Sequence, residues 1–168
     1  MRTTAGTVRG SHRTDGSGSL PWTWLPWATT ALAAAGVAIA SYLTVAHYTS
    51  PHVLACPDTG LINCLKVTTS PESSILGVPV AVIGLCYFGA LLYLCLPATW
   101  SKAGRAVVFG RQLLVSAGML FVLYLVGTEL IVLKAICAWC TAVHVVEFLL
   151  FVLVTSATSA MTGSRADT

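Results

Sequence analysis

Charged side chains are scarce in this chain of 168 residues: only 9% are Asp, Glu, Lys or Arg, whereas 56% are hydrophobic. About a quarter of the residues of a soluble domain are charged, so the composition excludes a soluble globular protein and indicates a membrane protein. The formal charge of +3 is small and scattered, which argues against nucleic acid as a partner. Internal repeats and low-complexity tracts do not stand out either, so nothing indicates a repeat architecture.

Long apolar runs are what the sequence has instead. Four of them are long enough to cross a bilayer core about 30 Å thick, which takes about 20 helical residues. Because these runs show no alternation, we expect helices rather than the strands of a barrel. We therefore predict an all-α membrane protein, a four-transmembrane-helix bundle with an extracytoplasmic loop between the first two helices. The predicted spans are residues 27–48, 75–96, 107–132 and 136–154.

Polar segments flank the apolar runs. Residues 1–22 are rich in Gly, Ser and Thr, and we predict a disordered cytoplasmic tail. Residues 23–157 form the predicted transmembrane domain, and residues 158–168 a short polar C-terminal tail. A cleaved signal peptide over the first run is the alternative, but the length of the run and its polar leader favour a retained helix.

The basic residues predict the orientation, because Lys and Arg mark the cytoplasmic side. Only Lys66 and Lys134 fall on the opposite side of the predicted bundle. We predict that both termini are cytoplasmic, so residues 56–74 and the start of the fourth helix share the outer face. The basic residues assigned to the cytoplasmic side are Arg2, Arg9, Arg13, Lys102, Arg105, Arg111 and Arg165.

The cysteines divide into an outer group of four and two within the second predicted helix. Cys86 and Cys95 are nine residues apart, which places them on opposite helix faces about 13.5 Å apart along the axis. They cannot bridge each other, and we interpret them as small buried apolar side chains. The outer group consists of Cys56, Cys64, Cys137 and Cys140.

The outer cysteines face an oxidising compartment, where disulfides form and persist. Cys137 and Cys140 form a Cys-x-x-Cys motif in the first turn of a predicted helix. A helix N-terminus stabilises thiolate and lowers the pKa of a cysteine, which makes it a good leaving group in disulfide exchange. Structural disulfides and metal ligands are the alternatives. A second cysteine pair on the same face favours a dithiol relay.

Ionisable residues continue the line of the Cys-x-x-Cys motif into the membrane. At 100° per residue, Cys137, Cys140, His144 and Glu147 lie within an arc of about 80° on one helix. Such groups are costly in a bilayer, face the bundle interior and often handle protons or ligands; hydrogen bonds to neighbouring helices are the alternative. A dithiol that becomes a disulfide releases two electrons and two protons, and the lipid-soluble acceptor of that kind is a quinone.

The stretch CPDTGLINCLKVTTSPESSILGVPVAVIGLCYF, followed later by CAWC, resembles the vitamin K epoxide reductase family in its bacterial branch, without a fused thioredoxin-like domain. The likeness covers residues 27–154. It consists of a loop cysteine pair, a serine six residues after the second of these cysteines, a Gly-x-Pro opening the second helix and Cys-x-x-Cys opening the fourth. The resemblance implies a four-helix bundle around a quinone of menaquinone or ubiquinone type, with electrons passing from the loop pair to the fourth-helix pair.

The resemblance also assigns roles to residues. Cys56 and Cys64 are similar to the loop cysteines of the family, Cys137 to the residue that exchanges with Cys64, and Cys140 to the residue that contacts quinone. Ser70 matches the loop serine of the family. No metal is implied.

Two positions of the implied quinone site differ from the family pattern. Val80 stands where many members have an asparagine, four residues before Gly84, and His144 replaces a tyrosine of some members. Because His144 can donate a hydrogen bond, we expect it to contact quinone together with Cys140, near Val80 and Ser70.

The function implied is that of a quinone-dependent thiol oxidoreductase in the bacterial plasma membrane. It would reoxidise a separate extracytoplasmic thioredoxin-like disulfide catalyst and pass the electrons to the membrane quinone pool. One alternative within the same family is reduction of vitamin K epoxide or quinone proper. Alternatives from other classes are a soft-metal-ion transporter with cysteine ligands and a structural membrane subunit with stapled loops.

Overall fold

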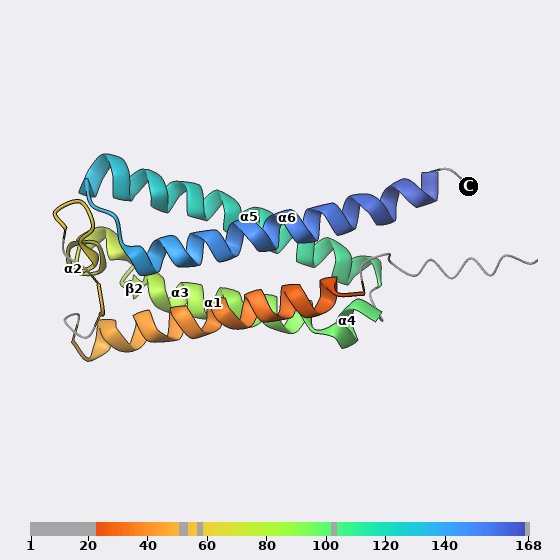
Figure 1. Cartoon of the computed structure of the whole chain (residues 1–168), viewed down its shortest axis with the longest axis horizontal. Coiled ribbons are helices and arrows are strands. Elements are labelled where there is room, and N and C mark those ends of the chain that lie inside the picture. The colour runs from red at the N-terminus through yellow and green to blue at the C-terminus, as the bar shows by residue number, and fades with distance from the viewer. Residues whose placement is uncertain (1–22, 51–53, 57–58, 102–103, 167–168) are drawn as a thin grey trace, which may run out of the picture.

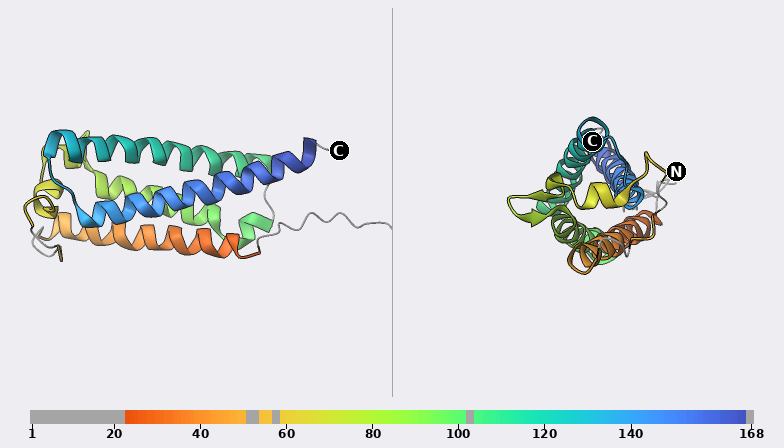
Figure 2. Two further views of the ribbon diagram at one scale, coloured as in Figure 1. Left: turned by 45° about the horizontal axis from the view of Figure 1, so that its top comes forward. Right: turned by 90° about the vertical axis from the view of Figure 1, so that its left-hand side faces the viewer.

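A computed structural model of the chain describes residues 23–50, 54–56, 59–101 and 104–166. The fold is mostly helical, and four helices run side by side along the long axis (Figure 1). Seen end-on they surround a common centre, with the loop segment after the first helix lying across one end (Figure 2). The four helices are α1 (Leu25–Tyr48), α3 (Val80–Cys95), α5 (Arg105–Gly127) and α6 (Ala138–Ala166).

Three segments are long and apolar enough to cross a membrane, namely Leu25–Tyr48, Arg105–Leu133 and Ala138–Ala160. The prediction of a multi-pass, mostly helical membrane protein is therefore confirmed at this level. Helix α3 has only 16 residues, whereas a full span takes roughly 20. Its length of about 24 Å is therefore shorter than a bilayer core of roughly 30 Å. The fourth span stays a prediction.

Helix α3 begins later than the predicted span 75–96 because the first residues of that span form a hairpin. Strands β1 (Ser74–Ile75) and β2 (Val78–Pro79) pair antiparallel. The two residues of the turn have left-handed φ values, 52° at Leu76 and 81° at Gly77, which an α-helix does not contain. Pro79 follows as the N-cap, so the helix starts only at the next residue.

Helix α6 extends beyond the predicted end at Val154 and runs to Ala166. Residues 155–166 contain no proline, and the hydroxyls of Ser156 and Thr158 donate back to carbonyls within the helix at 2.7 and 2.9 Å. The segment predicted as a polar C-terminal tail is thus helical as far as residue 166. The predicted tail at residues 1–22 lies outside the described residues.

Between α1 and α3 the chain forms two short helices that cover one end of the bundle (Figure 2). Helix α2 (Cys64–Thr68) is capped by Asn63, whose Oδ1 accepts a hydrogen bond of 2.8 Å from the Lys66 N–H. The 3₁₀ helix η2 (Pro71–Ser73) leads into the hairpin. Helix α4 (Pro97–Ser101) connects α3 to α5 at the opposite end.

Close packing of α1 on α3 depends on a glycine. A Cβ atom added to Gly36 would collide with the ring of Phe88, which is 2% exposed in the bundle core. Small residues let membrane helices approach closely where lipid supplies no hydrophobic driving force. Ala33 and Ala40 continue this small-residue face of α1 in the same core cluster.

Arg111, predicted to mark the cytoplasmic side, is almost completely buried. Its Nε and Nη2 donate to the carbonyl oxygen of Leu94 at 3.1 and 2.8 Å, near the C-terminus of α3. The guanidinium also lies 3.7 Å from the ring centroid of Trp100. The positive charge therefore satisfies a carbonyl at a helix end, where a cation is favourable.

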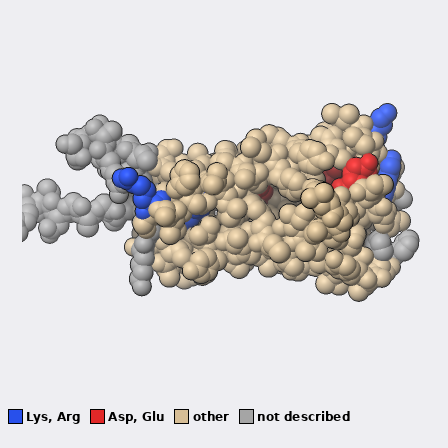
Figure 3. All heavy atoms as spheres, turned by 180° about the vertical axis from the view of Figure 1, so that it is seen from behind, with Lys and Arg blue, Asp and Glu red and all other residues tan. Residues whose placement is uncertain are grey.

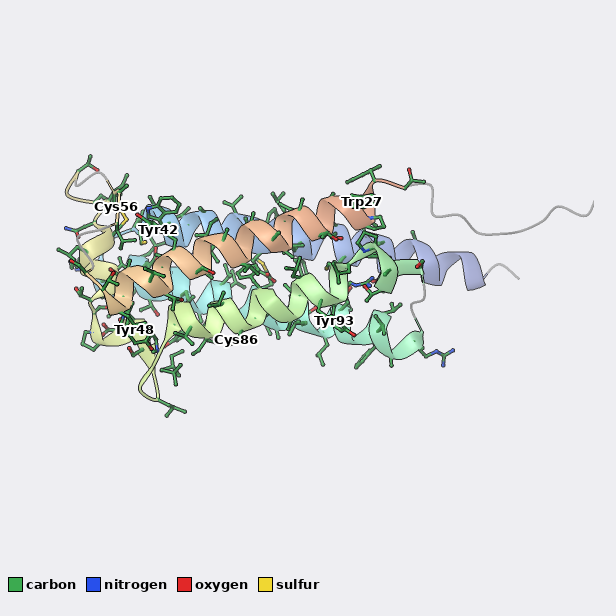
Figure 4. The ribbon with its side chains drawn as sticks, turned by 90° about the horizontal axis from the view of Figure 1, so that it is seen from below. Trp27, Tyr42, Tyr48, Cys56, Cys86 and Tyr93 are labelled. Carbon is green, nitrogen blue, oxygen red and sulfur yellow. A yellow bond between two sulfur atoms is a disulfide. The ribbon has the colours of Figure 1, made fainter. Side chains whose placement is uncertain are left out.

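The molecular surface has the charge distribution of a membrane protein. On the face shown in Figure 3, charged side chains gather at the two ends, and the broad belt between them is uncharged except for acidic atoms at the bottom of a hollow. Exposed aromatic residues lie towards both ends, with Trp27 and Tyr93 near one and Tyr48 near the other (Figure 4). Aromatic side chains favour such positions at membrane interfaces.

Candidate redox site and apolar cavity

The loop cysteines form a disulfide, Cys56–Cys64, with a Cα–Cα distance of 6.2 Å. Cys64 is 2% exposed and Cys56 half-buried. Side chains of two helices hold the loop beside this bond. The N–H of Ala55 donates to the Tyr42 hydroxyl at 3.2 Å, and the Trp139 indole donates to the Ala55 carbonyl at 3.1 Å. Figure 4 shows Tyr42 near Cys56 at this end of the bundle.

Backbone hydrogen bonds bring the loop to the start of α6. The N–H of Ile136 donates to the carbonyl of Leu61 at 2.9 Å, and the N–H of Asn63 donates to the carbonyl of Ile136 at 3.0 Å. The pairing is parallel, so the next residues of both segments advance in the same direction. Cys137 directly follows Ile136, and Cys64 is two residues after its bridge partner Ile62; both cysteines are buried in one apolar cluster.

The Cys-x-x-Cys motif occupies the N-terminus of α6. Cys137 directly precedes the helix, and its Sγ accepts a hydrogen bond of 3.3 Å from the Cys140 N–H. A hydrogen bond with the Cys140 thiol, aided by the backbone N–H groups of Cys140 and Trp139, lowers the pKa of Cys137 despite its burial. Cys137 is therefore the more acidic sulfur of the pair, the one placed beside the loop disulfide.

A cavity of about 490 Å³ lies among α1, α3, α5 and α6 and is lined mainly by apolar side chains. All four residues predicted to form the quinone site line it: Cys140, His144, Val80 and Ser70. Cys137 faces the loop cluster instead. The two cysteines of the motif therefore differ in their surroundings: Cys137 belongs to the buried cluster that contains Cys64, whereas Cys140 packs against that cluster and also lines the cavity.

Ser70 and His144, which both line the cavity, differ in their hydrogen bonds to the rest of the protein. Ser70 donates its hydroxyl to the carbonyl of Val67 at 2.9 Å, which fixes the turn before η2. The imidazole of His144 is 9% exposed and has no hydrogen-bond partner among the residues that the structure describes. Its donor is thus available to a molecule in the cavity, whereas that of Ser70 is used by the protein itself.

Glu129 lies near the end of the predicted span 107–132, and the sequence alone indicated no role for it. The structure places it in a π-helical turn, η3 (Thr128–Leu133), where it is 7% exposed and lines the cavity. Its carboxyl group lies near the Cys140 thiol and the backbone N–H of Cys137. The signal in the sequence was an acidic residue within an apolar run.

Tyr87 was also missed, because it reads as an ordinary aromatic residue of an apolar helix. Its hydroxyl donates to Oε1 of Glu147 at 2.7 Å, across the bundle from α3 to α6. Both residues line the cavity. The stripe predicted along the fourth helix therefore continues to Glu147, which pairs with a neighbouring helix.

The two cysteines within α3 lie on different sides of that helix. Cys86 is exposed on the outside of the bundle (Figure 4), whereas Cys95 is fully buried, so the predicted burial holds for Cys95 only. Within the described part of the chain, no group of three or more His, Cys, Asp and Glu side chains is placed to hold a metal ion.

The sequence profile described as the vitamin K epoxide reductase family matches residues 27–155, most of the chain. The chain belongs to the vitamin K epoxide reductase family. Members of the vitamin K epoxide reductase family are membrane oxidoreductases linked in general to quinone or vitamin K, so this chain is a multi-pass membrane protein of a redox family. No curated protein matches the sequence.

Proposed function

We propose that this member of the vitamin K epoxide reductase family is a quinone-dependent thiol oxidoreductase that reoxidises a separate extracytoplasmic thioredoxin-like protein. The observation that carries the proposal is that two cysteine pairs meet at one buried cluster, which contains Cys64 and Cys137 and against which Cys56 and Cys140 pack, beside an apolar cavity. Cys56 and Cys64 form a disulfide, whereas Cys137 and Cys140 are free thiols. A dithiol relay requires two such pairs, which exchange their disulfide.

The first exchange takes place at the loop. A thiolate of the partner attacks Cys56, the more exposed of the two loop sulfurs, and Cys64 leaves as thiolate. In the mixed disulfide, the second thiolate of the partner then attacks the partner sulfur that is bonded to Cys56, and Cys56 leaves as thiolate. The partner leaves with a disulfide, and both loop cysteines are reduced.

The second exchange takes place inside the cluster. The Cys64 thiolate attacks Cys137 of an oxidised Cys137–Cys140 pair, and Cys140 leaves as thiolate. Cys56 then attacks Cys64, which restores the loop disulfide and releases Cys137. The arrangement in the structure, a Cys56–Cys64 disulfide with free Cys137 and Cys140, corresponds to the state after this exchange.

The cavity suits a quinone. Its volume of about 490 Å³ lies within the roughly 300–1,000 Å³ of small-molecule sites, and its lining combines many apolar groups with a few polar ones. A bound quinone, of menaquinone or ubiquinone type, supplies the acceptor for the two electrons and two protons that leave the Cys137–Cys140 dithiol as its disulfide forms. Glu129, near the Cys140 thiol, would take its proton, and His144 would donate a hydrogen bond to one quinone oxygen.

The proposed activity is tested with purified protein in detergent, a reduced thioredoxin-like protein and a soluble quinone. We expect one quinone to be reduced for each partner disulfide formed, measured by quinone absorbance and by thiol titration. Quinone reduction without the partner's oxidation, or reduction of vitamin K epoxide alone, would instead favour a reductase of small molecules. The absence of any quinone turnover would overturn the proposal.

Replacement of His144 by phenylalanine is expected to raise the KM for quinone by about tenfold to a hundredfold. The reason is the loss of one hydrogen bond in a dry site, typically worth about 1–3 kcal/mol. Steady-state rates at varied quinone concentration measure the effect, and Val80→Asn in the same protein should restore part of the affinity by supplying an amide donor. Exchange between Cys64 and Cys137 is the control and should not change. An unaltered KM would show that His144 only packs.

We further propose that the protein lies in the bacterial plasma membrane with both termini in the cytoplasm and the loop disulfide outside. Thr59→Cys, at an exposed loop position, should react with a membrane-impermeant maleimide in intact cells. Ser101→Cys, exposed at the opposite end, is the matched control and should react only after permeabilisation. The reverse pattern would place the loop in a reducing compartment and contradict the relay.

A further inference from the structure

The carboxyl group of Glu147 lies deep in the bundle and is only half satisfied. The residue is 1% exposed and lines the cavity. Its Oε1 accepts the hydrogen bond from Tyr87, whereas its buried Oε2 has no hydrogen-bond partner among the described residues. Buried polar atoms are rarely left without a partner, and inside a bilayer the cost is higher still. The proposed relay does not use this group.

Three helices create the space for this pair. Tyr87 comes from α3 and Glu147 from α6, and Gly118 of α5 lies against both. A Cβ atom at Gly118 would collide with the Tyr87 hydroxyl and contact the carboxylate. The hydroxyl also lies 3.2 Å from the carbonyl oxygen of Leu114, so it is held from two sides. The tyrosine therefore holds one carboxyl oxygen, and the other is left without a hydrogen-bond partner among the described residues, in a residue that lines the cavity.

The position of Glu147 relative to His144 suggests what it binds. The two residues are three apart on α6 and line the same cavity, so their Cβ atoms are about 5–6 Å from each other. That separation is comparable to the distance between the two oxygens on opposite sides of a quinone ring. One flat molecule can thus face the imidazole with one oxygen and the carboxyl group with the other.

We propose that Glu147, oriented by Tyr87, is a second oxygen-binding subsite that holds the inner carbonyl of a ring dicarbonyl whose outer carbonyl faces His144. The ligand class rests on the proposed function. A neutral carboxyl group is less costly in the membrane than a carboxylate. With Oε1 accepting from Tyr87, the hydrogen of the neutral group sits on Oε2, which then donates to the inner carbonyl.

Binding to the fully oxidised protein tests this subsite without any electron transfer. The two probes are a dimethylnaphthoquinone, whose substituted ring carbons do not add thiols, and the matching dimethyltetralone, which lacks one of the two oxygens. By calorimetry, the wild type should bind the dicarbonyl about tenfold to a hundredfold more tightly. Glu147→Leu should remove most of this preference, whereas Glu147→Gln, which keeps a donor, should retain it within a few-fold.

Other variants separate ligand binding from packing. Glu72 also lines the cavity but is exposed near its outer end, so Glu72→Leu is a matched control that should leave the preference unchanged. Equal weakening of both probes by Glu147→Leu would show a purely structural role and overturn the proposal. Equal binding of both probes by the wild type would also overturn it. The proposed quinone turnover would survive either result, because the two assays are independent.

A spectroscopic measurement needs no destabilising substitution. In the infrared difference spectrum of the wild type, binding of the dicarbonyl should shift a carboxylic acid band, and binding of the tetralone should not. The shifted band should be absent in Glu147→Gln and should persist in Glu72→Gln. A spectrum without such a shift, despite measurable binding, would overturn the proposed donation from Glu147.

Discussion

Replacement of Cys140 by alanine is expected to abolish quinone reduction and to trap a disulfide between Cys64 and Cys137. The substitution removes the hydrogen bond with the Cys140 thiol, but the backbone N–H groups of residues 139 and 140 still favour the Cys137 thiolate, and Cys137 lies in the same buried cluster as Cys64. It therefore attacks Cys64, and without Cys140 no second sulfur is available to reverse the bond from its side. Electrophoresis without reductant and mass spectrometry of the linked peptides measure the trapped species, and quinone absorbance measures the lost turnover.

The other cysteine variants give this experiment its contrast. Cys137→Ala should trap little bridge to the loop, because Cys140 faces the cavity. Cys64→Ser should leave the Cys137–Cys140 pair oxidisable by quinone but unable to receive electrons from the partner protein. Cys86→Ala, on the outer surface of α3, is the matched control with ordinary turnover. A loop bridge in Cys137→Ala and none in Cys140→Ala would reverse the assigned roles.

Glu129→Gln is expected to lower the rate of dithiol oxidation by about a hundredfold or more, the usual contribution of a positioned general base. The carboxyl group of Glu129 lies near the Cys140 thiol, whereas a glutamine amide keeps the size but cannot take the proton. Mixing the pre-reduced protein with quinone in a stopped-flow instrument measures this step directly. The rate of the variant should rise with pH, because hydroxide then replaces the missing base.

The readouts for Glu129 distinguish proton transfer from packing. Glu129→Asp should recover part of the rate, since it restores a base on a shorter side chain, and the KM for quinone should change little in either variant. Glu72→Gln is the matched control at an exposed site of the same cavity and should behave as the wild type. A normal rate in Glu129→Gln would leave Glu129 a structural role at the π-helical turn.

Local sequence patterns were sufficient to predict the class of this protein, its helices and the residues that share a helix face. The scarcity of charge identified a membrane protein, and the apolar runs located its helices, because burial in lipid requires long uncharged segments. The spacing of Cys140, His144 and Glu147 placed all three on one helix face, and the structure puts them on one cavity. Such features depend on neighbours within two turns, so helical periodicity is sufficient to predict them.

Only the tertiary structure decided which groups meet across the bundle. Tyr87 and Glu147 are 60 residues apart in sequence, and their hydrogen bond depends on the close approach that Gly118 permits. Glu129 lies in a π-helical turn and comes near the Cys-x-x-Cys motif of another helix. Likewise, the loop reaches Cys137 through backbone hydrogen bonds to Ile136. Periodicity describes one element at a time, whereas these contacts depend on how separate elements pack together.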